Sequence, residues 1–213
     1  MSGTHVLVMA KSPRPGRVKT RLCPPCTPEE AAALAAAALA DTLAAVAACG
    51  ADRRVIALDG DPGPWLPQGF EVVPQCDGAF AHRLAHAWAT TGGPGVQIGM
   101  DTPQASAGQL DDALQALEGS EAALGHAADG GWWAIALRRP HPAVFTGVPM
   151  SHPETGRWQE ARLRQLGLGV TLLPTLVDLD TVEDLADVVG AAPRSETARL
   201  AGYLGLVETA TVG

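Results

Sequence analysis

The chain has 213 residues, 46% of them hydrophobic, which is enough to fill the core of one large domain. Its 15 basic and 23 acidic residues give a net charge of −8, and this balance argues against a nucleic-acid partner, which a broad basic face would have indicated. No apolar run approaches the ~20 residues of a membrane span, and the N-terminus lacks the pattern of a signal peptide. We therefore expect a cytoplasmic protein without a membrane span.

Apolar runs and helix-forming segments alternate at short spacing along the chain. The apolar runs predict strands at residues 5–9, 54–58, 70–73, 95–100, 122–125, 132–137 and 170–173. The other segments predict helices at residues 28–49, 79–90, 107–117, 154–166, 181–189 and 196–206. This alternation predicts an α/β fold in which helices cover both faces of a mostly parallel sheet. No linker-like stretch divides the chain, so we expect a single domain over residues 1–213.

The loop after the first predicted strand is purely cationic. It contains the only two lysines of the chain, and no acidic residue occurs before Glu29. Its basic residues are Lys11, Arg14, Arg17, Lys19 and Arg21. Such a density of like charges predicts an anionic ligand, and a polyphosphate suits it best. The alternative is a basic loop that only faces solvent.

The sequence of this loop indicates how it would hold phosphates. It is not a Walker A motif, because Val18 stands where that motif needs a glycine before the lysine, and the chain has no G-x-G-x-x-G. Side chains must therefore contribute to phosphate binding. Two prolines and Gly16 would bend the loop over the ligand. Arg17, Lys19 and Arg21 alternate, so an extended segment would point them the same way.

Carboxylates follow two of the predicted strands. Asp101 ends the fourth strand within G-M-D-T-P, and Asp178 and Asp180 follow the last strand within V-D-L-D. Mg²⁺ commonly takes one or two protein carboxylates and completes its shell with phosphates and water. We expect Asp101 and Asp180 to be the metal ligands, Mg²⁺ or Mn²⁺ being the cofactor. A turn or cap is the alternative for Asp101, and Thr181 with Asp184 forms a helix-capping pattern.

The segment D-G-G-W-W has two interpretations, a hairpin turn and a substrate site. Asp-Gly between apolar runs is a common hairpin signal. In the functional reading, Gly130 and Gly131 let a substrate approach the backbone, and Asp129 binds a metal or a hydroxyl. Strand alternation would bury one of Trp132 and Trp133 and leave the other facing a ligand. We therefore take Asp129, Gly130, Gly131 and Trp132 as the candidate acceptor site.

Cys23 and Cys26 form a C-P-P-C sequence in the proline-rich loop. No second pair with zinc-site spacing accompanies it, and it does not precede a helix in a thioredoxin-like unit. We expect these cysteines to be structural.

Five segments together resemble a known family. They are P-R-P-G-R-V-K-T-R-L (13–22), V-P-Q (73–75), G-M-D-T-P (99–103), D-G-G-W-W (129–133) and D-L-D-T-V-E-D-L (178–185). The chain resembles small bacterial transferases, mostly labelled glycosyltransferases, in the nucleotide-diphospho-sugar transferase superfamily. The cationic loop also looks like that of 2-phospholactate guanylyltransferases and, more distantly, molybdenum cofactor guanylyltransferases.

The resemblance implies a Rossmann-like three-layer α/β/α sandwich of the GT-A type with the nucleotide over the first half of the sheet. It implies Asp101 and Asp180 as metal ligands and phosphate contacts from the loop. It also implies that Gln75 helps to read the base. Arg83 matches a recurring arginine of the following helix, and we expect it among the nucleotide- and phosphate-binding residues. Trp132 and Met150 depart from the family pattern, and we expect them near the acceptor pocket.

Two reactions fit this site. In nucleotidyl transfer, an acceptor phosphate or hydroxyl attacks the α-phosphate of a nucleoside triphosphate and pyrophosphate leaves. In glycosyl transfer, an acceptor attacks the sugar carbon of a nucleotide sugar. A triphosphate carries roughly one to two more negative charges than a sugar diphosphate, and the dense cations favour it. We expect nucleotidyl transfer, with Lys19 and Arg21 stabilising pyrophosphate. Glycosyl transfer and a non-catalytic nucleotide-binding or interaction protein are the alternatives.

Overall fold

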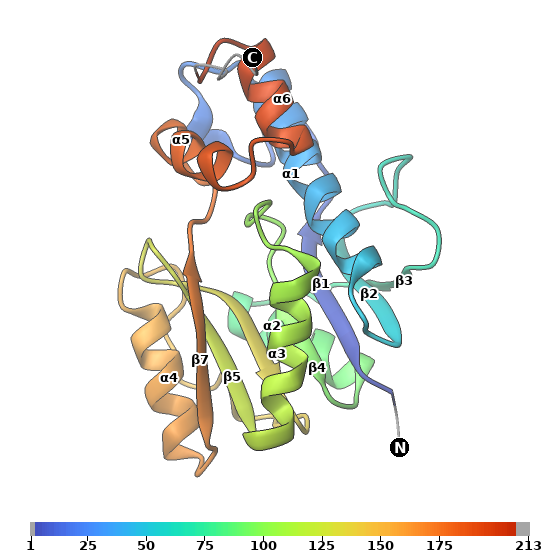
Figure 1. Cartoon of the computed structure of the whole chain (residues 1–213), viewed down its shortest axis with the longest axis vertical. Helices are drawn as coiled ribbons and strands as arrows, with labels where there is room; N and C mark the ends of the chain where they lie inside the picture. Colours follow the sequence, from blue (N-terminus) through green and yellow to red (C-terminus); the bar gives the residue numbers. More distant parts are fainter. Residues whose placement is uncertain (1–2, 208–213) are drawn as a thin grey trace.

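A computed structural model describes residues 3–207 of the chain, and Figure 1 shows its course. Its strands are β1 (His5–Lys11), β2 (Arg53–Asp59), β3 (Glu71–Pro74), β4 (Gly95–Ile98), β5 (Ala122–Ala127), β6 (Trp132–Leu137) and β7 (Val170–Leu176). Its helices are α1 (Pro28–Ala48), α2 (Phe80–Thr91), α3 (Ala107–Gly119), α4 (Thr155–Gln165), α5 (Val182–Ala191) and α6 (Glu196–Tyr203), with a short 3-10 turn, η1 (Thr20–Leu22). Every predicted strand and helix is present, although several ends differ by a few residues. The expected domain of residues 1–213 includes residues outside the described range.

The strands form one sheet in the order β3-β2-β1-β4-β6-β5-β7. All neighbours pair in parallel except β6, which is antiparallel to both β4 and β5. The predicted mostly parallel α/β fold is therefore confirmed. The chain runs outward from β1 through β2 to β3 and then returns to β4 on the other side of β1. The carboxyl ends of β1 and β4 thus flank the point where the strand order reverses, which is where open α/β sheets bind ligands.

Helices cover both faces of the sheet. The side chains Val6 and Val8 of β1 pack with Leu39 of α1 and Leu110 of α3 on one face. On the other face, the alternate residues of β1 pack with α2 and α4. Both faces of β1 are buried, which explains its continuous apolar sequence. The three layers match the predicted sandwich.

Helix α1 also takes part in a third hydrophobic cluster. Its first half packs against η1, α5 and α6 around Leu22, Leu34, Leu179 and Leu185. Figure 1 shows α5 and α6 beside this half of α1, beyond the strand ends. The predicted cap is confirmed, since Thr27 and Glu30 form a reciprocal capping box. This cluster fixes where the segment after β7 can run.

Helix α1 is the described helix that is long and apolar enough to cross a membrane, although Asp41 interrupts its apolar sequence. It has 21 residues, and an 18-residue window within it has a mean hydropathy of 1.8. Half of that apolar window is buried inside the fold. Packing against the sheet and α6 accounts for its apolar composition.

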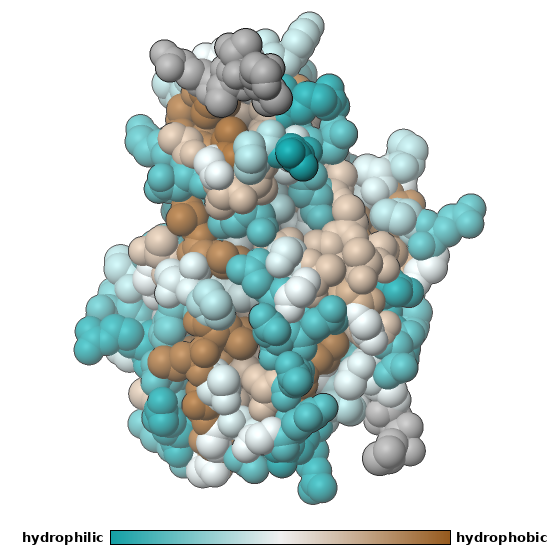
Figure 2. Space-filling model, in the orientation of Figure 1, coloured by the Kyte–Doolittle hydropathy of each residue, from teal (hydrophilic) through white to brown (hydrophobic). Residues whose placement is uncertain are grey.

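The outer strand β7 has hydrophobic side chains at the surface. Figure 2 shows them gathered over this strand, where Leu172 is exposed. Strand β7 pairs only with β5 in the sheet. The carboxyl end of β7 leads directly to the segment that contains Asp178 and Asp180.

Candidate active site at the carboxyl ends of β1 and β4

A cavity of about 840 Å³ lies at the carboxyl ends of β1 and β4. It is lined by residues from the cationic loop, the segment after β4, the first turn of α2, the β5–β6 hairpin, the loop before α4 and the segment before α5. Its charged lining consists of Lys11, Arg17, Lys19, Arg21, Arg83, Asp101, Asp129, Asp178, Asp180 and Asp184. Basic and acidic side chains are therefore equally numerous, and the site is not simply cationic.

Backbone contacts bring the two acidic segments together. The N–H of Leu179 donates to the carbonyl of Asp101 at 2.8 Å, and the Leu179 side chain is fully buried. The carboxylate of Asp184 accepts from the backbone N–H groups of Asp180 and Thr181, at 3.0 and 2.7 Å. The predicted capping role of Asp184 at α5 is thus confirmed. These bonds hold the backbone of Asp180 beside the end of β4.

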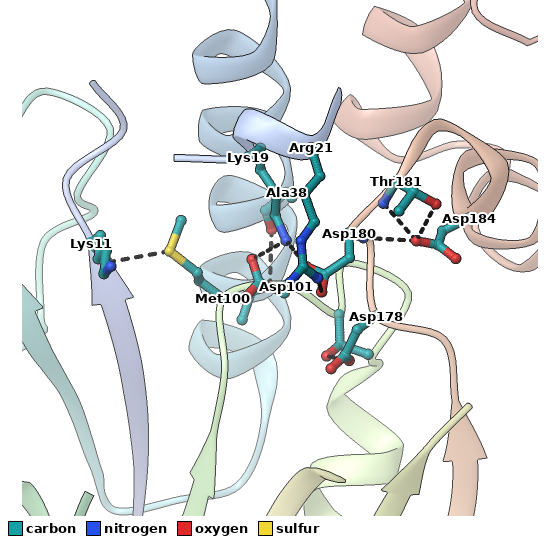
Figure 3. Close-up of polar contacts among 12 residues, drawn as sticks. Lys11, Lys19, Arg21, Ala38, Met100, Asp101, Asp178, Asp180, Thr181 and Asp184 are labelled. Carbon is teal, nitrogen blue, oxygen red and sulfur yellow. Dashed lines mark hydrogen bonds and ion pairs between the residues drawn. The ribbon is translucent and has the colours of Figure 1, made fainter. Parts of the chain in front are cut away.

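Lys19 joins these two segments to the cationic loop. Its Nζ lies 2.6 Å from Asp101 Oδ1 and 2.9 Å from Asp180 Oδ1. Only 7% of its side chain is exposed. Burial alone would lower the pKa of Lys19, but the two carboxylates outweigh it and raise that pKa above its ordinary value. Figure 3 shows Lys19 and Arg21 reaching from one segment toward these aspartates.

The basic segment is not extended, so the expected common direction of alternating side chains does not apply. Lys19 has φ 48°, a left-handed conformation, and η1 begins directly after it. The turn separates the three side chains. Lys19 is buried between two carboxylates, and Arg21, which is 74% exposed, approaches Asp180 Oδ2 at 3.5 Å. Arg17 lines the cavity and forms no ion pair within the described residues.

The converging carboxylates have the chemistry of a divalent-metal site. Asp101 Oδ1 and Asp180 Oδ1 both contact one cationic nitrogen, so both oxygens point to one position. Hard oxygen donors suit Mg²⁺ and Mn²⁺, and two protein carboxylates are a common number for a metal that also binds phosphates. Within residues 3–207, no group of three or more His, Cys, Asp or Glu side chains is arranged to hold a metal.

Asp178 lies below this pair and faces another direction (Figure 3). Its Oδ1 accepts a hydrogen bond of 2.9 Å from Thr102 Oγ1. Burial raises the pKa of Asp178 to about 7, and the nearby carboxylates of Asp101 and Asp129 add to this effect. Asp178 and Asp180 both line the cavity but have different partners, Thr102 for Asp178 and Lys19 for Asp180.

A second cationic centre lies on the α2 side of the cavity. The guanidinium of Arg83 donates from Nη1 to Gln75 Oε1 at 3.0 Å and lies over the ring of Phe80. The Gln75 amide nitrogen donates to the carbonyls of Ala10 and Ala57, at 2.8 and 2.9 Å. Both amide N–H groups of Gln75 are thus used within the protein, and its oxygen accepts from Arg83. Gln75 therefore positions Arg83 at the ends of β1 and β2, and it also lines the cavity.

Two predicted phosphate-binding residues lie outside the cavity lining. Arg14 pairs with Asp61 at 2.6 Å on the surface, and Gly16 forms an exposed turn with φ 69°. The turn does bend the loop as expected, because the N–H of Arg17 donates to the carbonyl of Arg14. Lys11 lines the cavity, and no acidic partner is found for it in the described part of the chain.

The D-G-G segment is a hairpin turn between β5 and β6, as its hairpin reading predicts. A Cβ on Gly130 would lie 1.8 Å from the carbonyl oxygen of Pro153. The close approach at Gly130 is therefore made by the protein itself and not by a substrate. Asp129, Gly131, Trp132 and Trp133 line the cavity. Trp133 is almost entirely buried and donates its ring N–H to the Pro174 carbonyl.

Sequence reasoning missed several lining residues. Phe80 and the loop Met150–Pro153 face the cavity, although only Met150 was expected near it. Phe80 lies one helical turn before Arg83, so the spacing i, i+3 on α2 could have indicated it. Ser151 has φ 59°, and no sequence signal predicts this conformation. Cys23 and Cys26 are free thiols in the described structure, and Cys26 packs in the cluster around α1.

Comparison with known proteins supports this description. A solved structure from Desulfovibrio desulfuricans, provisionally named a nucleotide-diphospho-sugar transferase, is 28% identical with a TM-score of 0.87, covering 97% of each chain. The manganese complex of Rv0371C from Mycobacterium tuberculosis is 20% identical with a TM-score of 0.50, over 89% of this chain and 99% of that one. CMP:2-keto-3-deoxy-manno-octonic acid synthetase complexed with CTP is 13% identical with a TM-score of 0.54, over 91% and 99%. The last two share the fold.

The comparison with curated proteins gives no significant match. The 28% identical relative confirms the resemblance to the nucleotide-diphospho-sugar transferase superfamily, and solved nucleotidyltransferases share the fold. A family model matches residues 31–152, which is more than half of the chain and includes Asp101. The chain therefore belongs to the family described as "Uncharacterized protein conserved in bacteria (DUF2064)".

Proposed function

We propose that this protein is a metal-dependent nucleotidyltransferase, which transfers a nucleotide from a nucleoside triphosphate to a small phosphorylated or hydroxyl acceptor and releases pyrophosphate. The convergence of Asp101 and Asp180 on Lys19, beside further cations in one cavity, carries this proposal. The acidic part of the lining suits a metal ion, and the basic part suits the phosphates that bind it.

Each group has a distinct role in this proposal. Asp101 and Asp180 hold Mg²⁺ or Mn²⁺, which when bound neutralises charge on the phosphate oxygens. Lys19 and Arg21 stabilise the leaving pyrophosphate, and Arg17 orients the phosphates. No nucleophilic side chain is required, because positioning and electrostatics supply much of the rate in phosphoryl chemistry.

The proposed phosphate contacts leave out one of the expected cations. Arg14 is paired with Asp61 outside the cavity, whereas Arg83, also expected among the phosphate-binding residues, lines the cavity from α2. Lys11, Arg17 and Arg83 are the best candidates for phosphate contacts in the resting protein, because Lys19 is already neutralised by two carboxylates. Arg83 has only a distant acidic partner, Asp59, at 3.8 Å. These three cations, together with a metal bound by the carboxylates, would suit the larger charge of a triphosphate better than that of a sugar diphosphate.

The acceptor side is proposed at the β5–β6 hairpin. Asp129, Gly131 and Trp132 line the cavity there, and the loop Met150–Pro153 also contributes to the lining. Trp132 stacks on Phe145 at a ring-centroid distance of 6.1 Å, so its ring is held in place. Asp129 accepts from the N–H of Gly131 and has a second oxygen for an acceptor hydroxyl.

Glycosyl transfer from a nucleotide sugar is the second candidate, and the provisional name of the 28% identical relative favours it. The same metal, phosphate contacts and cavity would serve a nucleotide sugar. The leaving group would then be a nucleoside diphosphate.

A thermal-shift screen of nucleoside triphosphates and nucleotide sugars, with and without Mg²⁺ or Mn²⁺, tests the proposal and identifies the donor. Product analysis with a panel of phosphorylated acceptors then separates the reactions, because pyrophosphate indicates nucleotidyl transfer and nucleoside diphosphate indicates glycosyl transfer. Binding without turnover indicates a non-catalytic nucleotide-binding protein. No shift with any nucleotide would contradict both enzymatic candidates.

Asp101→Asn is the variant for this test. Loss of one such electrostatic contact should reduce turnover by roughly 10²–10³-fold. Asp61→Asn is the matched control, because Asp61 is an exposed carboxylate that pairs with Arg14 outside the cavity. Full metal-dependent turnover by Asp101→Asn would overturn the assignment.

A further inference from the structure

We propose that Lys19 is an internal counter-cation that occupies the metal position of the resting site and leaves it when the metal binds. This inference rests on the proposed function, because it assigns the metal to Asp101 and Asp180. It adds that Lys19 and the metal exclude one another. The phosphates of the substrate then become the new partner of Lys19.

The geometry of Lys19 carries the first step. Its ammonium contacts Asp101 Oδ1 and Asp180 Oδ1 at 2.6 and 2.9 Å, so it uses an oxygen of each proposed metal ligand. A metal held by these same oxygens would lie beside the ammonium. Two positive charges at such a separation repel strongly in a partly buried site. One of them must move, because the same two carboxylate oxygens would hold both.

Lys19 is the cation that can move. Its ammonium is a compact charge on a flexible four-carbon stem, and three rotatable donors let it change partners. Lys19 lines the cavity, so its ammonium could contact a phosphate bound there. The backbone of Lys19 already has the left-handed φ of 48°, and the N–H of Leu22 donates to its carbonyl at 3.0 Å. The turn can therefore remain in place while the side chain moves.

The other basic residues do not share this arrangement. Arg21 contacts Asp180 at 3.5 Å, and 74% of its side chain is exposed. Lys11 also lines the cavity but forms no ion pair with Asp101 or Asp180. Lys19 alone among the described residues bridges the two carboxylates, so the exchange depends on it.

The exchange couples the two ligands. Metal alone must displace Lys19 from two ion pairs, so the metal binds weakly to the resting protein. A polyphosphate offers Lys19 another anionic partner, so metal and polyphosphate increase each other's affinity. The resting protein keeps its two carboxylates neutralised, which limits their repulsion without a metal.

The chain has only two lysines, which permits a direct measurement on the unmodified protein. Labelling with ¹³C at lysine Cε gives two side-chain signals, which Lys11→Met and Lys19→Met assign. Titration with Mg²⁺ alone should shift and sharpen the Lys19 signal as the side chain is released, and leave Lys11 nearly unchanged. Addition of inorganic tripolyphosphate at saturating Mg²⁺ should shift the Lys19 signal again. A Lys19 signal that stays constant while Mg²⁺ binds would overturn the exchange.

Manganese affinity provides the second measurement. Electron paramagnetic resonance of free Mn²⁺, without any phosphate, gives the dissociation constant for each variant. Lys19→Met should bind Mn²⁺ about tenfold more tightly than the unmodified protein, since one charge-assisted contact no longer competes. Lys11→Met, which removes the same charge from the same cavity, should change the affinity by less than about threefold. Equal or weaker Mn²⁺ binding by Lys19→Met would contradict the proposal.

Different outcomes would contradict the proposed exchange and the proposed function. If Mg²⁺ still promotes nucleotide binding but Lys19→Met shows no gain in Mn²⁺ affinity, only the exchange is wrong. If no variant binds Mn²⁺ and no nucleotide binds with Mg²⁺, the proposed function is wrong as well. If Lys19→Met does not fold, the lysine spectra of the unmodified protein decide the question, with Lys11→Met assigning both signals.

Discussion

Lys19 and Asp180 form an ion pair of 2.9 Å although they lie 161 residues apart in the chain. The pair connects the cationic loop after β1 with the acidic segment after β7. The buried cluster of α1, α5 and α6 includes one residue from each segment, Leu22 and Leu179. The bond from Leu179 to Asp101 attaches the acidic segment to the end of β4. The proposed site therefore depends on packing that lies outside the cavity itself.

Arg17 and Arg14 provide a matched test of the cationic loop. Both are exposed arginines, but Arg17 lines the cavity and Arg14 pairs with Asp61 outside it. Arg17→Met should weaken nucleotide binding with Mg²⁺ by about tenfold, the effect of one charge-assisted contact. Arg14→Met should leave the affinity within about twofold, as measured by isothermal titration calorimetry. An equal loss in both variants would indicate that only the net charge of the loop matters.

Gln75 should act through Arg83. Glutamate at this position cannot donate to the carbonyls of Ala10 and Ala57, and its charge would neutralise Arg83. Gln75→Glu should therefore weaken nucleotide binding about as much as Arg83→Met, roughly tenfold. The control is Gln115→Glu, which adds the same charge at an exposed position of α3. A Gln75→Glu variant with a changed preference among bases and an unchanged affinity would show instead that Gln75 reads the base.

Gly130 should be required for packing. Its φ of 91° disfavours other residues, and an added Cβ would collide with the Pro153 carbonyl at 1.8 Å. Gly92 has φ 65° with no atom within 4 Å of the same position, so Gly92→Ala measures backbone strain alone. Gly130→Ala should cost at least about 2 kcal/mol more than Gly92→Ala in urea unfolding. Similar losses in both variants would refute the Pro153 contact.

His5 should make stability depend on pH. Burial, with Arg53 nearby, lowers the pKa of His5 from 6.5 to about 4, and both ring nitrogens lack hydrogen-bond partners. Below pH 6.5 the unfolded chain binds a proton that the folded protein does not, so stability falls as pH decreases toward 4. Between pH 7 and pH 5, His5 should lower the free energy of unfolding by about 2 kcal/mol.

His5→Phe tests that contribution. The phenyl ring keeps the contact with Trp88, whose ring centroid lies 5.6 Å from that of His5, and it cannot titrate. The stability difference between pH 7 and pH 5, from urea unfolding, should be smaller in the variant by about 2 kcal/mol. An unchanged pH dependence would show that His5 titrates normally in the folded protein.

Local sequence features predicted the elements and their type. The fully buried run of β1, the capping box of Thr27 and Glu30, and the Asp-Gly hairpin each depend on neighbouring residues, and each is present. The order of the strands and the reversed β6 depend on contacts between distant segments. No local pattern contains that information, so only the class of sheet was predictable.

The same distinction applies to the site. Strand ends predicted that Lys19, Asp101 and Asp180 would lie together, since the carboxyl ends of parallel strands share one edge. The left-handed turn at Lys19 and the bonds from the Gln75 amide to two backbone carbonyls were not predictable. Both depend on which carbonyls and carboxylates the fold places nearby. The functional roles of these residues stay predictions.

The central claim is that a metal-bound nucleotide occupies the cavity between Lys19, Asp101 and Asp180. The most direct test is a crystal of the protein with Mn²⁺ and the nucleotide that stabilises it most, with anomalous data recorded at the manganese edge. We expect a manganese peak within bonding distance of Asp101 and Asp180, with phosphates against the cationic loop. A nucleotide bound in this cavity with manganese away from both carboxylates, or a nucleotide bound elsewhere, would contradict the account.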